Sequence, residues 1–307
     1  MSRPTVIVIT GPTASGKSAL AVSLAEKLDT EIINADSRQI YQGIPIVTAA
    51  PSKEEKKGVM HHLLEFLPLE GYYSAACFQE DATLLLNKIF ENKETAIVCG
   101  GSMLYIDALV HGIDELPTVP QNIREPLAEE WKRNGNEWLL EKLRELDRDY
   151  FDKTDLRNLK RVFHAVEISL TAGVPYSSLL TGRSLGNILP FDIIKICLTG
   201  SRESLFNRIN QRVLDMMEKG LMEEARNVYH LRHLNSLNTV GLKEMFTYFD
   251  GNFTLDEAIS RIQKNTRVYA KKQLTWHRRD ENIRYLDFEN SSDYNIDKII
   301  RMISQKS

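Results

Sequence analysis

The stretch GPTASGKS, residues 11–18, has the residue types and the spacing of a loop that binds phosphate groups, G-x-x-x-x-G-K-[ST]. Its glycines let backbone N–H groups turn towards phosphate oxygens, Lys17 can reach an outer phosphate, and the Ser18 hydroxyl can ligate Mg²⁺. We therefore predict a phosphate site with Ser18 as its metal ligand. The residues assigned to it are Gly11, Pro12, Thr13, Ala14, Ser15, Gly16, Lys17 and Ser18.

An acidic residue follows the second apolar run of the chain. Asp36 ends EIINAD, residues 31–36. A carboxylate there can hold the metal directly or through water, act as a general base beside the phosphate loop, or cap a turn. TAIVCG, residues 95–100, ends instead in glycine and supplies no acid.

Four short apolar runs are typical of buried strands, at residues 5–10, 31–36, 95–100 and 191–200. Helical patterns lie between them, and this alternation predicts an α/β fold with a parallel sheet. Between 113 and 190 the chain is rich in charges and in apolar residues at helical spacing, without a convincing strand. We expect a P-loop core of residues 1–112 and 191–307, with C-terminal helices, and an inserted helical domain at 113–190.

The composition excludes several classes of protein. The three cysteines are far apart, which argues against a disulfide framework and a thiolate zinc site. No apolar stretch approaches the roughly 18 residues that span a membrane, and no signal peptide is recognisable, so we expect a cytoplasmic protein without membrane contact. The formal net charge of −3 gives no general support for nucleic-acid binding, so an RNA site would need a local cluster of charge.

Further motifs occur in one order along the chain: INADSRQIYQG, HHLLEF, YYSAACF, CGGSMLYIDAL, SRESLFNRINQRVLDMMEKGL, VGLKEM and TRVYAKKQLTWHRR. Together with the phosphate loop they resemble the bacterial tRNA dimethylallyltransferase family, also called tRNA isopentenyltransferase, from about residue 5 to residue 279. The resemblance implies an adenylate-kinase-like P-loop fold that holds the diphosphate of dimethylallyl diphosphate. It also implies transfer of the dimethylallyl group to N6 of the adenosine 3′ of the tRNA anticodon, with Mg²⁺ as the cofactor.

The resemblance assigns four catalytic residues. Asp36 is expected to accept the proton of the attacking amine, and Arg202 to clamp the phosphates. Ser102 keeps a hydroxyl where the family has threonine, and Arg124 matches a family position associated with catalysis. Plainer roles remain for two of them, namely a helix N-cap for Ser102 and a surface salt bridge for Arg124.

Three groups of residues are expected to contact the anticodon stem-loop of tRNA. The first matches the family segment that meets the target adenosine: Asp36, Ser37, Arg38 and Gln39. The second is a basic stripe near the C-terminus: Lys264, Arg267, Lys271 and Arg278. The third lies within about two helical turns of the insertion: Arg157, Lys160, Arg161 and His164. Ordinary solvated side chains are the alternative for each group.

The chain departs from the family pattern at Val47, Ala50, Arg157, Asn158, His164 and Leu242. These positions belong to motifs expected to face RNA, which leaves two alternative functions open. One is a small-molecule or nucleotide kinase, which would share the ATP-binding type of loop. The other is a tRNA-binding paralogue that has lost activity. For the enzyme we expect a monomer.

Overall fold

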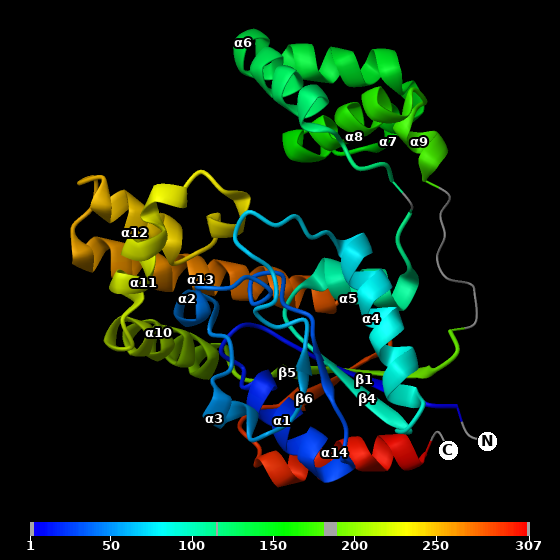
Figure 1. Ribbon diagram of the computed structural model, residues 1–307, viewed down its shortest axis with the longest axis vertical. Coiled ribbons are helices and arrows are strands. Elements are labelled where there is room, and N and C mark those ends of the chain that lie inside the picture. Colours follow the sequence, from blue (N-terminus) through cyan, green and yellow to red (C-terminus); the bar gives the residue numbers. More distant parts are fainter. Residues whose placement is uncertain (1–2, 115, 181–188, 306–307) are drawn as a thin grey trace. The chain divides into compact units, whose positions relative to one another are not determined.

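Figure 1 shows the computed structural model of the chain, which describes residues 3–114, 116–180 and 189–305. The chain forms two compact units. One consists of Met1–Val110 and Ile188–Ser307, and the other of His111–Asn187. The sequence-based division placed the junctions slightly further along the chain, at residues 113 and 190. Each unit has its own apolar core.

The first unit is built on six parallel strands in the order β3-β2-β4-β1-β5-β6, which confirms the predicted α/β class. Their bounds are β1 Thr5–Thr10, β2 Ile32–Asn34, β3 His61–His62, β4 Thr95–Cys99, β5 Asp192–Thr199 and β6 Ile283–Asp287. The four predicted strands, β2, β4, β1 and β5, occupy the four central positions of the sheet. The two edge strands were not predicted, because β3 is too short to show a pattern and β6 is half exposed.

Helices cover both faces of the sheet, because successive residues of a strand point to opposite sides. On one face Ile7 and Ile9 pack with α1 (Lys17–Leu28), α14 (Ser292–Ser304), α10 (Arg202–Glu218) and α13 (Leu255–His277). On the other face Val6 and Val8 pack with α4 (Ala75–Phe90) and α5 (Met103–His111). The carboxyl ends of β1, β2 and β4 are left to the loops that carry the predicted chemistry.

A third apolar cluster of this unit lies beside the sheet. It joins the segment around Ile40 and Val47 to the helical segment 213–262. The remaining elements here are α2 (Pro45–Thr48), α3 (Lys53–Lys56), α11 (Leu221–Val228), η1 (Tyr229–Leu231), η2 (Asn235–Leu237) and α12 (Leu242–Phe249). Gly220 and Gly251 have φ angles of 98° and 77° and lie between helices.

Among the residues that the structure describes, the regular elements of the second unit are all helices. It contains α6 (Gln121–Leu146), α7 (Arg148–Lys153), α8 (Leu159–Ala172) and α9 (Tyr176–Leu179). Leu139 and Leu143 of α6 pack on Val162 and Val166 of α8, and α6 is interrupted at Gly135, whose φ is 82°. This segment forms packed helices although it is rich in charges, because its apolar residues recur at helical spacing and make one continuous stripe along each helix.

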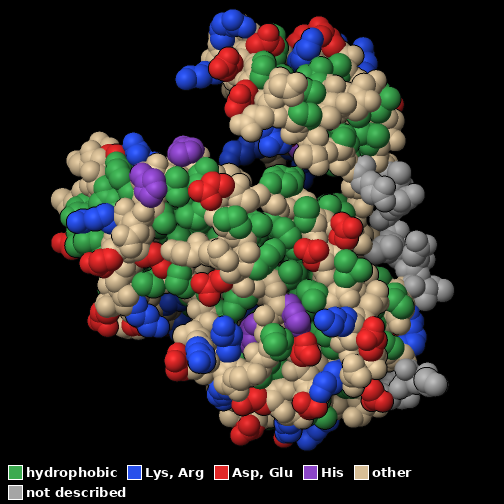
Figure 2. All heavy atoms as spheres, viewed as in Figure 1, with side chains coloured by type: hydrophobic (Ala, Val, Ile, Leu, Met, Phe, Trp, Pro, Cys, Tyr) green, Lys and Arg blue, Asp and Glu red, His purple; other side chains and the backbone are tan. Residues whose placement is uncertain are grey.

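The surface of the first unit mixes both signs of charge. Figure 2 shows acidic and basic side chains interspersed over its visible face. Across the described ranges of the chain, no helix is both long enough and apolar enough to cross a membrane.

Candidate active site

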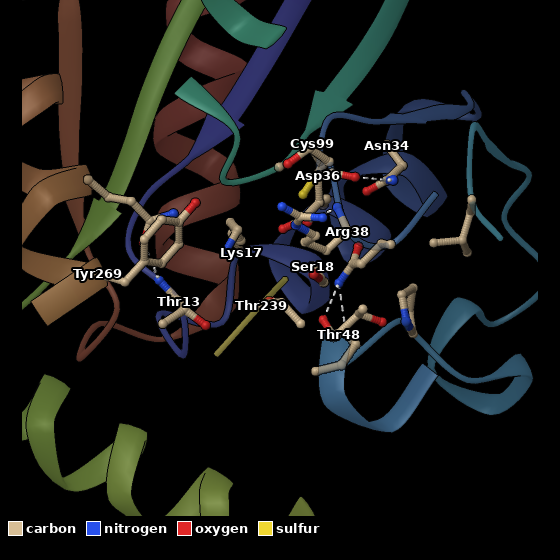
Figure 3. A pocket seen from close by; sticks show the side chains of 18 of the residues that line it. Thr13, Lys17, Ser18, Asn34, Asp36, Arg38, Thr48, Cys99, Thr239 and Tyr269 are labelled. Carbon is tan, nitrogen blue, oxygen red and sulfur yellow. Dashed lines mark hydrogen bonds between the residues drawn. The ribbon is translucent and has the colours of Figure 1, made fainter. Parts of the chain in front are cut away.

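A cavity of about 340 Å³ lies where the phosphate loop meets the carboxyl ends of β2 and β4. In Figure 3, Lys17 lies between Thr13 and Tyr269 on one side and Asp36 and Arg38 on the other. Polar residues that line the cavity include Thr13, Lys17, Ser18, Asn34, Asp36, Ser37, Arg38, Gln39, Thr48, Arg212, Asn238, Thr239, Tyr269 and Gln273. All of these residues belong to the first unit.

The phosphate loop is shaped by two glycines and opens onto an uncapped helix. Gly11 has a φ of 143°, and a Cβ there would lie 2.3 Å from the Leu198 carbonyl oxygen, so a larger residue does not fit. Gly16 has a φ of 86° and precedes α1, whose N-terminus has no side-chain cap. The first backbone N–H groups of α1 are therefore available to an anion.

Besides Arg38, the cationic side chains of Lys17 and Arg212 line this cavity. Lys17 is only partly buried as a residue, but its ammonium group is enclosed by protein, and this desolvation lowers its pKa. The charge of Arg212 lowers it further, while Cys99 and Asp36 oppose the shift. Burial likewise lowers the pKa of Arg212. Two desolvated cations close together favour a multiply charged anion between them.

Asp36 is fixed by the loop that follows β2. Its Oδ1 accepts the backbone N–H of Arg38 at 2.9 Å, and the Ser37 N–H donates to the Ser102 Oγ at 2.7 Å. Ser102 itself is buried and is not among the residues lining the cavity. It therefore acts by orienting the loop that carries Asp36, and its backbone oxygen begins α5 by accepting the N–H of Ile106.

The side chain of Arg38 is committed to the protein. Its NH1 donates to the carbonyl oxygens of Asn235 at 2.9 Å and Ser236 at 3.0 Å. These bonds join the Asp36 loop to η2, and the residues that follow η2, 238–240, form another wall of the cavity. Gln39 is also engaged, since its amide donates to the carbonyl oxygens of Thr48 and Ala49 at 3.1 and 2.8 Å. Both side chains build the cavity, although both were predicted to contact RNA.

Sequence reasoning missed the contribution of α13 to this site. Gln273 is 1% exposed; its Oε1 accepts the Thr13 N–H at 3.0 Å and its Nε2 donates to the Gly101 oxygen at 2.9 Å. One turn later, the buried His277 shares a 3.2 Å hydrogen bond with the Thr10 hydroxyl. Both are polar residues on the buried stripe of an amphipathic helix, and that unusual position was the available signal.

Gly101 separates the two principal functional groups. A Cβ on it would lie 3.7 Å from both the Asp36 Oδ2 and the Lys17 Cε. The same Cβ would meet Gln273 Nε2 at 2.6 Å, and one on Gly100 would meet the Ala35 carbonyl at 2.1 Å. The two glycines of CGGSMLY are therefore required for the close approach of the loops after β2 and β4.

Neither of the two predicted catalytic arginines is among the residues that line the cavity. Arg202 is exposed at the start of α10, with its guanidinium carbon 5.2 Å from the centroid of the Phe206 ring, and it does not line the cavity. Arg212, nearly three turns further along the same helix, does. Arg124 belongs to the second unit, where it forms two hydrogen bonds with the buried Glu167 at 2.8 and 2.9 Å.

The residues predicted to bind RNA in the insertion are exposed. Arg157 pairs with Asp155 at 3.0 Å, and Asn158 caps the start of α8 through the Arg161 N–H. His164 Nδ1 bonds Glu167 at 2.9 Å, on the residue that Arg124 also binds. Despite its burial, Glu167 has a lowered pKa because of these two partners. Lys160 and Arg161 are exposed on the same helix.

On α13, Lys264 and Lys271 are exposed and Arg267 is partly buried, while Arg278 is exposed at its C-terminal cap. Two departures from the family pattern, Val47 and Leu242, are buried in one apolar cluster. Gly241 directly precedes Leu242, and a Cβ on this glycine would lie 2.4 Å from Val47 Cγ2. These two side chains therefore affect core packing rather than a surface that RNA could touch, whereas Ala50 is partly exposed.

The comparisons with known proteins identify the family of this chain. A family model described as IPP transferase matches residues 39–280. The chain is 46% identical over 290 residues to tRNA dimethylallyltransferase 1 of Bacteroides thetaiotaomicron, covering 94% of each chain. It is 48% identical over 279 residues to tRNA dimethylallyltransferase 1 of Phocaeicola vulgatus, covering 91% of this chain and 92% of the relative.

Solved structures of tRNA-modifying prenyltransferases also resemble this chain. A tRNA isopentenylpyrophosphate transferase from Bacillus halodurans superposes with a TM-score of 0.73 at 35% identity, covering 99% of this chain and 97% of that one. A eukaryotic dimethylallyltransferase acting on tRNA gives a TM-score of 0.84 at 26% identity, covering 99% and 80% of the two chains. The chain belongs to the tRNA dimethylallyltransferase family, whose fold and phosphate loop it shares.

Proposed function

We propose that this protein transfers a dimethylallyl group from dimethylallyl diphosphate to N6 of the adenosine 3′ of the anticodon in tRNA. The observation that carries this proposal is the meeting of Lys17, Ser18 and Asp36 in one cavity. A phosphate loop alone serves many reactions, but a carboxylate facing it across Gly101 supplies the base that an amine nucleophile needs.

The diphosphate is expected to lie on the uncapped N-terminus of α1, with Lys17 and Arg212 at its oxygens. As the bond between C1 and oxygen breaks, both electrons leave with the diphosphate. Donors that are already in place stabilise this developing charge without reorganisation. Arg212 takes the role that the sequence had given to Arg202, because Arg212 is the α10 arginine that lines the cavity.

Asp36 is proposed to accept the proton that N6 loses when nitrogen attacks C1. The adenine amine is a weak nucleophile, since its lone pair is delocalised into the ring. Oδ1 is held by the Arg38 N–H, and Oδ2 borders Gly101 in the cavity. Ser102 fixes the same loop from behind through Ser37, so its hydroxyl is assigned a positioning role.

The donor set also fits Mg²⁺. The Ser18 hydroxyl lines the cavity, and an oxygen donor of this kind binds Mg²⁺ together with substrate phosphates. The ion would supply positive charge to the leaving diphosphate. Ser18 is the proposed ligand from the loop.

For tRNA, the proposed contacts are the exposed basic residues of α13 and of α8. The mixed charge of the visible surface makes such local clusters necessary, since the whole molecule carries a net negative charge. The base itself would enter beside Tyr269 and Thr239, which line the cavity. A loop base has to be turned out of its stack to do so.

The test is to incubate purified protein with bulk tRNA, Mg²⁺ and labelled dimethylallyl diphosphate, with a parallel reaction that contains ATP. Label in the RNA, located at the adenosine 3′ of the anticodon, is the expected result. Consumption of ATP with an unlabelled RNA would instead indicate a kinase. Binding of tRNA without either reaction would indicate a paralogue that has lost activity.

A further inference from the structure

A second hollow lies on the surface between α10 and α13, apart from the cavity. It is lined by Arg202, Glu203, Phe206, Asn207, Asn210 and Arg267, and none of these residues lines the cavity. The α10 residues Arg202, Phe206 and Asn210 are spaced by four, so they share one helical face. The hollow is therefore a feature built by two packed helices.

Three cations surround the ring of Phe206. The distances to its centroid are 5.2 Å for Arg202 Cζ, 5.5 Å for Lys271 Nζ and 5.9 Å for Arg267 Cζ. A ring face attracts cations and holds their side chains in place, which lowers the entropy lost when they bind an anion. Phe206 thus gathers positive charge that would otherwise spread over the surface.

This positive charge is only partly neutralised. Arg267 NH1 donates to Asn210 Oδ1 at 2.5 Å, which orients the guanidinium without cancelling its charge. Within the described part of the chain, Arg202 and Lys271 form no ion pair, and Glu203 is the single carboxylate among the residues that line the hollow. Guanidinium groups oriented in this way suit phosphate oxygens.

The hollow and the cavity lie on different faces of one helix. Thr266, Tyr269 and Gln273 of α13 line the cavity, whereas Arg267 lines the hollow and Lys271 reaches it. At about 100° per residue the mean directions of these two sets differ by about 150°, or two-fifths of a turn around the helix axis. A ligand that spans both faces would have one end beside Tyr269 and the other beside Phe206.

We propose that this hollow binds the phosphodiester backbone of the RNA substrate close to the nucleotide whose base enters the cavity. The proposal rests on the proposed function and specifies it further. Arg202 then contacts RNA phosphate instead of the diphosphate donor, which explains why it lies outside the cavity. Phosphate contacts of this type position a nucleic acid without reading its sequence.

The test compares the double variant R202Q/K271Q with wild type and with Lys298→Gln, which removes an exposed cation of α14. The dissociation constant of a synthetic anticodon stem-loop RNA is measured at several KCl concentrations, alongside prenyl transfer from labelled dimethylallyl diphosphate. Each lost phosphate contact should reduce the slope of log K against log salt by about 0.7–0.9. We expect a loss of affinity of about tenfold or more, with the KM for the diphosphate donor and the kcat at saturating RNA unchanged.

A second arm measures binding of inorganic phosphate and pyrophosphate. If the double variant binds these ions more weakly but the slope of log K against log salt for RNA is unchanged, the hollow is a site for free anions and the proposal is wrong. An unchanged salt slope for RNA binding in a double variant that still transfers the prenyl group overturns the proposal as well. A wild-type protein that transfers no prenyl group would instead contradict the proposed function. Phe206→Leu, checked for folding by its melting temperature, should lower RNA affinity because the cations lose their common platform.

Discussion

Gln273 accepts the backbone N–H of Thr13 at 3.0 Å, although 260 positions separate the two residues in the chain. Its other amide atom donates to Gly101, so a single buried side chain joins the phosphate loop to the loop after β4. The same helix presents basic residues to solvent. The helix expected to hold RNA is thus also a structural part of the phosphate site.

Replacing Gln273 with leucine should weaken binding of the diphosphate donor. The Thr13 N–H and the Gly101 oxygen would lose their partner, and an unsatisfied buried group costs about 1–3 kcal/mol. We expect the KM for dimethylallyl diphosphate to rise about tenfold, since each 1.4 kcal/mol is tenfold in affinity. Initial rates over a range of donor concentrations measure this change.

Gln273→Glu is the informative companion, because a carboxylate can still accept from Thr13 but cannot donate to Gly101. Gln273→Glu should therefore have a donor KM between those of wild type and Gln273→Leu. Gln211→Leu, on the exposed face of α10, is the matched control and should leave the KM unchanged. Equal donor KM values in wild type and Gln273→Leu would contradict the assigned role.

Asp36→Asn should lower kcat and leave donor binding nearly unchanged. The amide oxygen can still accept the Arg38 N–H, so the loop keeps its geometry while the proton acceptor is lost. General-base assistance typically contributes about 10² to 10⁴ in rate. Single-turnover transfer, with donor affinity measured separately, distinguishes the two effects, and a variant that loses donor binding and rate in parallel would argue for a purely structural aspartate.

Arg38→Ala should reduce stability and kcat/KM without changing the salt dependence of RNA binding. The guanidinium donates to two carbonyl oxygens, and a hydrogen bond from a charged group contributes about 1.5–3 kcal/mol. Urea unfolding and RNA titrations in several salt concentrations check both statements. If stability were unchanged and the salt slope fell, Arg38 would be an RNA contact, as the sequence had suggested.

The buried His277 should make folding sensitive to mild acid. Burial, assisted by the charge of Lys17, lowers its pKa from 6.5 to about 4. Between these two values the unfolded chain binds a proton that the folded chain does not, so stability is complete above pH 6.5 and falls as the pH drops towards 4. Near pH 5 the expected loss is about 2 kcal/mol.

Urea unfolding at pH 7.5 and pH 5 measures this loss. His277→Gln removes the titrating group, so its stability should change less between the two pH values than that of wild type. His233→Gln, at an exposed histidine, is the control and should behave like wild type. A wild-type protein equally stable at both pH values would contradict the predicted acid sensitivity.

Much of the fold could be predicted because its signals are local. The run at 5–10 and the glycines of the loop encode strand, turn and helix within a few residues, and Asp36 follows its strand directly. Edge strands were missed because their residues are half exposed or too few. Sequence reasoning did not consider Arg212, because a sequence motif does not reveal where along its length a helix passes the cavity.

Local patterns along the chain were enough to predict the parallel sheet, the phosphate loop, the aspartate near it and the family resemblance. The side chains that build the cavity became known from the packing: Arg38 and Gln39 tie its walls together, and Gln273 and Arg212 reach it from distant helices. The physical reason is that a short pattern encodes local backbone geometry. Contacts between residues hundreds of positions apart depend instead on how the finished helices pack against the sheet.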